Sequence, residues 1–161
     1  MRGGVLPPAL LFSALGLALT FTARGIWVPS LLALVASLVV GTYLPLSQYW
    51  LETIFLGCWI SAIATAASVH LRGGLHPRAA VALSVNAGFW GGAVSVISGT
   101  RLDLLDALPC VLLLLPASWL ASRYSSIPAK VISSWIIVIA ALAATLQMLP
   151  VTPGYMPDHL E

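Results

Sequence analysis

The sequence predicts an all-α, polytopic integral membrane protein with six transmembrane helices. Two observations predict this class: 60% of the 161 residues are hydrophobic and only 7% are charged. A soluble domain carries about 25% charged residues, because its surface must face water. With a mean hydropathy of +1.00, most of this surface is expected to face lipid. We therefore expect a single transmembrane domain over residues 1–161, with no soluble domain attached.

Charges and prolines divide the chain into six apolar segments of the length that crosses a bilayer. About 20 helical residues cross the ~30 Å hydrocarbon core, and lipid offers no hydrogen-bond partners to a non-helical backbone. The expected spans are residues 5–23, 26–46, 53–71, 79–100, 104–122 and 131–149, and residues 150–161 are expected to form an extended aqueous tail.

The charged residues predict the orientation of these spans. With six helices, the loops around Arg24, residues 72–78 and residues 123–130 share one side and carry five positive charges, while the other side has Arg2, Arg101 and all five acids. The positive-inside rule places the basic loops in the cytoplasm and both termini outside, in the cell's inner (plasma) membrane. The first span has the basic start of a signal peptide, but its removal would move the second basic loop outside, which the rule disfavours.

Two pairs of segments indicate an internal repeat. "CWISAIATAA" (58–67) resembles "SWIIVIAALA" (134–143), and "VPSLLALVAS" (28–37) resembles "LPCVLLLLPAS" (108–118). With three helices in each half, the two halves would form inverted repeats, which are common in transporters whose site lies between the halves. The alternative is that apolar segments resemble one another by chance.

The fourth span carries a stripe of small residues at a spacing of four, which places them along one side of a helix. Such residues let another helix backbone approach closely, within the chain or between subunits, and they also leave room for a solute in a narrow pore. Both interpretations bury this face. The residues expected to pack against other helices are Ala87, Gly88, Gly91, Gly92 and Gly99, and Ser95 is a candidate for lining a pathway.

Asn86 is the clearest polar residue at depth in the expected membrane. An unsatisfied amide in hydrocarbon costs several kcal/mol, so its side chain is expected to face protein or water. It either forms a hydrogen bond between helices or orients a solute at the middle of a pathway. Phe89 and Trp90 flank it and either fill space or form an aromatic constriction.

The other spans contribute weaker signals. Ser61 and Thr65, four residues apart in the third span, are further candidates for lining a pathway, although such hydroxyls often bond their own helix. Pro116, in the interior of the fifth span, removes a helix hydrogen bond and predicts a kink. Glu52, Asp103 and Asp106 either form an acidic mouth on the outer side or complement helix dipoles.

Several classes of activity have no support in the sequence. There is no GxSxG, HExxH or phosphate-binding loop, so neither a catalytic residue, a metal site nor a cofactor is predicted. Cys58 and Cys110 lie in apolar runs and are expected to be buried hydrophobes, with a disulfide as the alternative. No basic block suits nucleic acid. No charged residue lies at mid-membrane, which disfavours a proton-driven pump and favours a neutral or passively moving solute.

Together these features predict a small channel or facilitator-type transporter for a small polar solute. Its expected partners are the lipid bilayer, the solute, and further copies of the chain or other membrane subunits. Two other interpretations remain open. The chain is a multipass subunit or assembly factor of a larger membrane complex, or it is a membrane-embedded enzyme that acts on a lipid or a quinone.

Overall fold

A computed structural model of the chain describes residues 5–71, 73–98, 106–123 and 126–149. Within these ranges the chain is helical with no strand, which confirms the predicted all-α class. The α-helices are α1 (Leu6–Leu19), α2 (Trp27–Thr42), α3 (Leu51–Ser68), α4 (Pro77–Ser98), α6 (Leu114–Arg123) and α7 (Ile127–Met148). Short 3₁₀ helices are η1 (Arg24–Ile26), η2 (Gln48–Trp50) and η3 (Leu108–Leu113).

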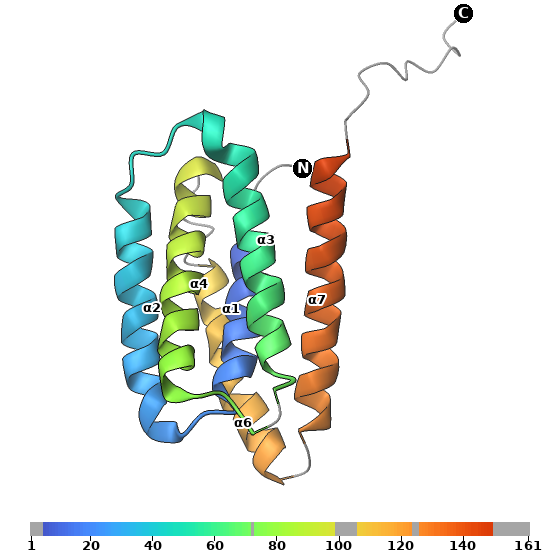
Figure 1. The fold of residues 1–161 in the computed structure, drawn as a ribbon. Helices are drawn as coiled ribbons and strands as arrows, with labels where there is room; N and C mark the ends of the chain where they lie inside the picture. Colours follow the sequence, from blue (N-terminus) through green and yellow to red (C-terminus); the bar gives the residue numbers. More distant parts are fainter. Residues whose placement is uncertain (1–4, 72, 99–105, 124–125, 150–161) are drawn as a thin grey trace, which may run out of the picture.

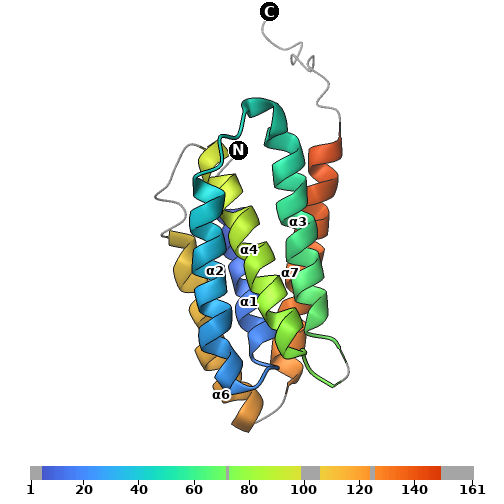
Figure 2. The same cartoon turned by 60° about the vertical axis from the view of Figure 1, so that its left-hand side comes forward.

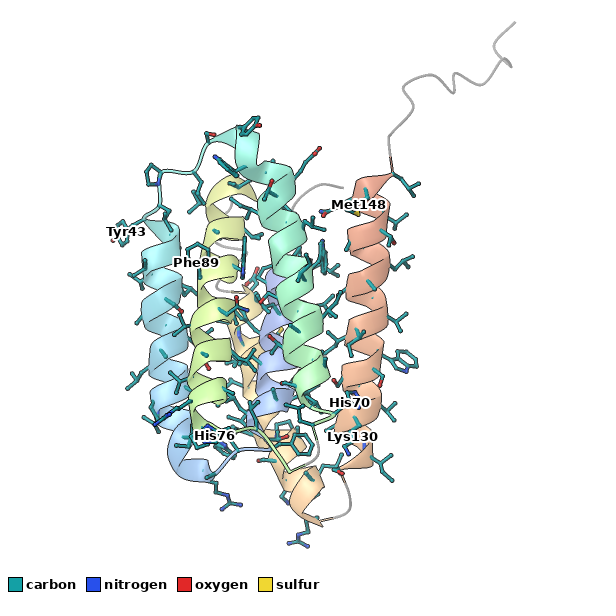
Figure 3. All side chains as sticks on the ribbon, in the orientation of Figure 1. Tyr43, His70, His76, Phe89, Lys130 and Met148 are labelled. Atoms are coloured by element: carbon teal, nitrogen blue, oxygen red, sulfur yellow. The ribbon has the colours of Figure 1, made fainter. Side chains whose placement is uncertain are left out.

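The helices form two layers. Figure 1 shows α2, α4, α3 and α7 side by side, with α1 and α6 behind them, and the turned view in Figure 2 keeps this arrangement. Consecutive helices run in opposite directions, so the loops before α2, α4 and α7 all lie at one end of the bundle. The described cations Arg24, Arg78, Arg123 and Lys130 belong to this end, which we call the basic end. In Figure 3, His70, His76 and Lys130 lie at the basic end, whereas Tyr43 and Met148 lie at the other.

Four segments are long and apolar enough to cross a membrane: Arg24–Thr42, Leu51–Ser68, Pro77–Ile97 and Ile127–Met148. The other two expected spans correspond to the shorter apolar segments Leu6–Leu19 and Leu108–Ala121. The structure therefore shows four candidate spans rather than six within the described residues. These four are the helices of the front layer, and the shorter two lie behind them.

Side-chain donors end α1 early. The hydroxyl of Thr22 and the indole Nε1–H of Trp27 both donate to the backbone oxygen of Leu19, at 2.7 Å and 3.0 Å. The hydroxyl of Thr20 donates to the oxygen of Leu17. These side chains add hydrogen bonds to carbonyls at the C-terminal end of α1 that also accept the backbone N–H groups of Thr20 and Thr22.

The fifth expected span is divided. It begins as the 3₁₀ helix η3 and continues as α6 from Leu114. Pro116 is therefore in the first turn of α6, where a missing N–H costs little, rather than in the middle of one continuous helix. The change of helix type occurs two residues before the predicted kink.

Helix α1 packs against more elements of the described bundle than any other helix. Ten of its residues are buried, from Pro7 to Leu19, and it packs against α3, α4, η3, α6 and α7. A helix that is apolar on every side is expected to be surrounded, and α1 is covered along most of its 14 residues, with Leu6 exposed at its start. The middle of the described bundle is thus filled by apolar side chains such as Leu11, Phe12 and Leu15.

The repeat alignment does not pair equivalent positions of α3 and α7. It matches Trp59 with Trp135, but Trp59 is 4% exposed and Trp135 is 69% exposed. The structure does not establish the inverted repeat in this register.

Candidate functional site

Asn86 joins α4 to α3. Its amide nitrogen donates a hydrogen bond to the hydroxyl oxygen of Ser61 on α3. Its amide oxygen accepts a hydrogen bond of 3.1 Å from the indole Nε1–H of Trp90, one turn along α4. The structure thus places Asn86, Ser61 and Trp90 in one hydrogen-bonded cluster, as expected for a polar group that is removed from water.

Gly57 of α3 makes room for the ring of Trp90. A Cβ atom built at Gly57 would overlap the Trp90 indole, so the ring lies directly against the α3 backbone. This glycine was missed in the sequence, although Gly57, Ser61 and Thr65 are spaced by four and therefore share one side of α3. We call these three residues, with Asn86 and Trp90, the α3–α4 seam.

Thr65 extends the seam toward the basic end. It is fully buried, and its hydroxyl oxygen has no hydrogen-bond partner among the described residues. Burying a hydroxyl without a partner costs roughly 1–3 kcal/mol by protein mutational data. The Thr65 hydroxyl therefore lies in the protein interior with no described group to bond.

Two other buried polar groups lack partners within the described structure. They are the Ser30 hydroxyl on α2 and the indole nitrogen of Trp59 on α3. Sequence reasoning did not select either residue, because serine and tryptophan are common in apolar helices and only the folded contacts show that these groups are unpaired.

Phe89 and Ser95 lie outside the seam. Phe89 is 37% exposed on the outer side of α4, and Figure 3 shows Phe89 on the α2 side of that helix. Its ring meets the Trp90 ring edge-on, with ring centroids 5.4 Å apart. Ser95 is buried, and its hydroxyl donates to the oxygen of Gly92 at 2.7 Å. The structure does not bring these two candidates together with Asn86.

The small-residue face of α4 packs within the chain, against two different helices. Cβ atoms built at Gly88 and Gly92 would contact the backbone oxygens of Leu34 and Leu38 on α2, the latter at 2.6 Å. A Cβ at Gly91 would lie 2.7 Å from the ring of Phe12 on α1. Ala87 is fully buried, and Gly99 is outside the described residues.

The predicted acidic mouth is described only in part. Glu52 is exposed in the first turn of α3, where a carboxylate complements the helix dipole. Asp106 is exposed just before η3, and Asp103 is outside the described residues. No contact in the described structure joins Glu52 to Asp106.

The histidines and cysteines form no metal site among the residues described. His70 lies 3.4 Å from the hydroxyl of Ser134 on α7, and Nδ1 of His76 accepts the backbone N–H of Arg78. Cys58 and Cys110 are both free thiols. Cys58 is fully buried in the apolar core, which agrees with its expected role as a small hydrophobe.

An apolar pocket of about 180 Å³ lies between α1, η3, α6 and α7, away from the seam. Nine residues line it: Leu17, Leu113, Pro116, Ala117, Leu120, Ala121, Pro128, Ala129 and Ile132.

Comparisons of the chain with known protein families, with curated proteins and with solved structures found no match.

Proposed function

We propose that the chain is a multipass membrane protein that forms a channel or facilitator for a small polar solute, and that the solute passes along the α3–α4 seam. The observation that carries this proposal is the row of polar groups from Trp90 through Asn86 and Ser61 to the unpartnered hydroxyl of Thr65. Each group offers a hydrogen bond at a depth where lipid offers none.

The described arrangement corresponds to a closed pathway. The ring of Trp90 lies against Gly57, and the amide of Asn86 is occupied by Ser61 and Trp90. Movement of the indole away from Gly57 frees Oδ1 of Asn86 and opens the row to a solute. Trp90 is thus the gate, and Asn86 is the group that exchanges its protein partners for the solute.

The chemistry of the seam favours a neutral solute. Glu52 lies at the start of α3 and Arg78 at the start of α4. Neither helix carries another charged residue. Hydroxyl, amide and indole groups both donate and accept hydrogen bonds, whereas an ion would need charges or a ring of carbonyls to replace its hydration. A small molecule with hydroxyl or amide groups fits these partners.

We further propose that the protein lies in the inner (plasma) membrane with its basic end in the cytoplasm and both termini outside. The four described cations at the basic end, opposite Glu52, support this orientation through the positive-inside rule. The exposed apolar faces of α2 and α7 then contact lipid, other subunits or further copies of the chain.

An inverted repeat, in a register other than the one aligned in the sequence, is part of the proposal. The first half comprises α1, α2 and α3, and the second comprises α4, η3 with α6, and α7. The second span of the first half, α2, packs against the first span of the second half, α4. The second span of the second half, beginning with η3, packs against the first span of the first half, α1. Both contacts use a glycine. Gly92 would place a Cβ 2.6 Å from the oxygen of Leu38, and Gly16 would place one 2.8 Å from the oxygen of Val111. We propose that these two contacts are equivalent positions of an inverted repeat of the kind found in transporters.

The experiment is a flux assay with the purified chain in liposomes. Stopped-flow light scattering records the swelling of vesicles in glycerol, urea or another small neutral solute. We expect faster swelling than in protein-free vesicles for at least one of them, and an altered selectivity among solutes for Asn86→Ala. Swelling equal to that of protein-free vesicles for every solute tested, in wild type and in Trp90→Ala, would refute the proposed permeation.

A second function, that of a small subunit of a larger membrane complex, is favoured by one observation. The centre of the bundle is filled by α1, and Asn86 already has protein partners. A packed bundle of this kind suits docking within the bilayer. Inert vesicles together with co-purification of a defined membrane partner would select this function.

A further inference from the structure

The pocket between α6 and α7 is an apolar cavity near the basic end, lined by Ala121 at the end of α6 and Pro128 at the start of α7. Its walls are aliphatic side chains and prolines from α1, η3, α6 and α7, and they offer no polar group that a water would need. An apolar cavity of about 150 Å³ stays dry and accepts a benzene-sized apolar molecule. At about 180 Å³, this pocket is large enough for a short stretch of hydrocarbon.

Arg123, the one described cation of α6, ends that helix close to this pocket. Arg123 follows Pro116 by seven residues, close to two full turns, so both residues lie on nearly the same side of the helix. The guanidinium carbon of Arg123 lies 6.0 Å from the ring centroid of Trp119, one turn earlier. Trp119 does not line the pocket, so this contact places the charge beside the pocket, past Ala121, the last pocket-lining residue of that helix.

The basic end, next to the pocket, carries positive charge. The described residues of the basic end include Arg24, Arg78 and Lys130 in addition to Arg123, and no described acid belongs to this end. Lys130 is in the first turn of α7 but on the opposite side of the helix from Pro128 and Ile132, toward α3. Arg123, on nearly the same side of α6 as Pro116, is therefore the described cation next to the pocket-lining residues.

We propose that the α6–α7 pocket binds an anionic phospholipid, with part of one acyl chain between α6 and α7 and the phosphate against Arg123. Basic pockets between transmembrane helices on the cytoplasmic side bind anionic headgroups, and the apolar lining together with the adjacent cation matches both ends of such a molecule. The proposal rests on the membrane location proposed above but not on the permeation of a solute.

Native mass spectrometry of the detergent-purified chain tests this site. The probes are dioleoylphosphatidylglycerol, which is anionic, and dioleoylphosphatidylcholine, which has the same chains and no net charge. One cation near a membrane surface adds about 1 kcal/mol of attraction, or about fivefold in affinity. We expect one phosphatidylglycerol to bind about fivefold more tightly than phosphatidylcholine, and Arg123→Gln to remove most of this preference.

Two further variants separate a defined site from a general effect of charge. Arg24→Gln removes the same charge from the same end but away from the pocket, and it is expected to keep the preference. Ala117→Leu fills the pocket without touching Arg123, and it is expected to weaken the binding of both lipids. Equal effects of Arg123→Gln and Arg24→Gln, or unchanged binding in Ala117→Leu, would overturn the proposal. Because this experiment measures lipid binding, its result does not depend on the result of the flux assay.

Discussion

The indole nitrogen of Trp90 donates a hydrogen bond of 3.1 Å to Oδ1 of Asn86, one turn earlier on the same helix. This bond orients the amide so that its nitrogen donates to Ser61 on α3. A polar group on α4 is thereby linked to a partner on α3 and to an aromatic ring that packs against Gly57. We expect both the stability of the bundle and the proposed pathway to depend on this cluster.

Replacing Asn86 by alanine is expected to lower the free energy of unfolding by about 1–2 kcal/mol. The change removes one interhelical hydrogen bond and leaves the Ser61 hydroxyl and the Trp90 N–H without a partner. Thermal unfolding in detergent, followed by circular dichroism, measures the effect. Thr145→Ala is the matched control, because the Thr145 hydroxyl is exposed and bonds its own helix at Leu142. Equal stability of the two variants would show that the cluster contributes nothing.

Gly57 and Trp90 are expected to be energetically coupled. In Gly57→Ala the new methyl group overlaps the indole, and overpacking of this kind costs about 1–3 kcal/mol. In a Trp90→Ala background the same substitution is expected to be neutral or stabilising by up to ~1 kcal/mol, because the ring is gone and alanine favours the helix. A double-mutant cycle of unfolding free energies gives the coupling directly. Additive effects would contradict the contact between Gly57 and the ring.

The glycines at the two backbone contacts are expected to be equivalent. Gly92→Ala and Gly16→Ala each place a Cβ within 2.6–2.8 Å of a backbone oxygen on the neighbouring helix. The helices must separate, and this cost of about 1–3 kcal/mol exceeds the ~1 kcal/mol that alanine gains in helix propensity.

Gly25→Ala is the control for this pair, since a Cβ at Gly25 meets nothing within 4 Å. We expect it to unfold at or above the wild-type temperature. If Gly92→Ala and Gly16→Ala are as stable as Gly25→Ala, the close approach of the helices is wrong. A loss of stability in only one of them would contradict the proposed equivalence of the two halves.

The proposed orientation predicts which loops an impermeant reagent can reach. Single cysteines are introduced at Tyr49 and at Gly25, which lie exposed at opposite ends of the bundle, in a Cys58→Ala/Cys110→Ala background. A membrane-impermeant maleimide added to intact spheroplasts is expected to label Tyr49→Cys, and to label Gly25→Cys only after the cells are broken. The reverse pattern would place the basic end outside.

Much of the fold follows from hydropathy, because an apolar segment without charges has to be helical in lipid. Each of α2, α3, α4 and α7 overlaps an expected span. The end of α1 is accompanied by local hydrogen bonds from Thr22 and Trp27. The fifth expected span begins as a 3₁₀ helix. Hydropathy does not report either feature. The central place of α1 follows from its contacts, although its apolar character on every side was a usable signal.

The seam was only partly visible in the sequence. Asn86 stands out because an amide at depth must find a partner, and Ser61 was selected as a polar residue of the third span. That these two meet, and that Trp90 fills the space left by Gly57, depends on the register between α3 and α4. The small residues of α4 looked like one face, but they divide between α2 and α1, because a helix at the middle of a bundle has several neighbours.

The pathway itself is tested most directly by blocking it at Thr65. In the Cys58→Ala/Cys110→Ala background, Thr65→Cys places a thiol in the seam, and Ile60→Cys places one on the exposed side of the same helix, where Ile60 is 56% exposed. Solute flux into proteoliposomes is recorded before and after treatment with a small methanethiosulfonate reagent. We predict that the reagent reduces flux through Thr65→Cys severalfold and leaves Ile60→Cys unchanged. Flux that is equally insensitive in both variants would contradict a pathway along the α3–α4 seam.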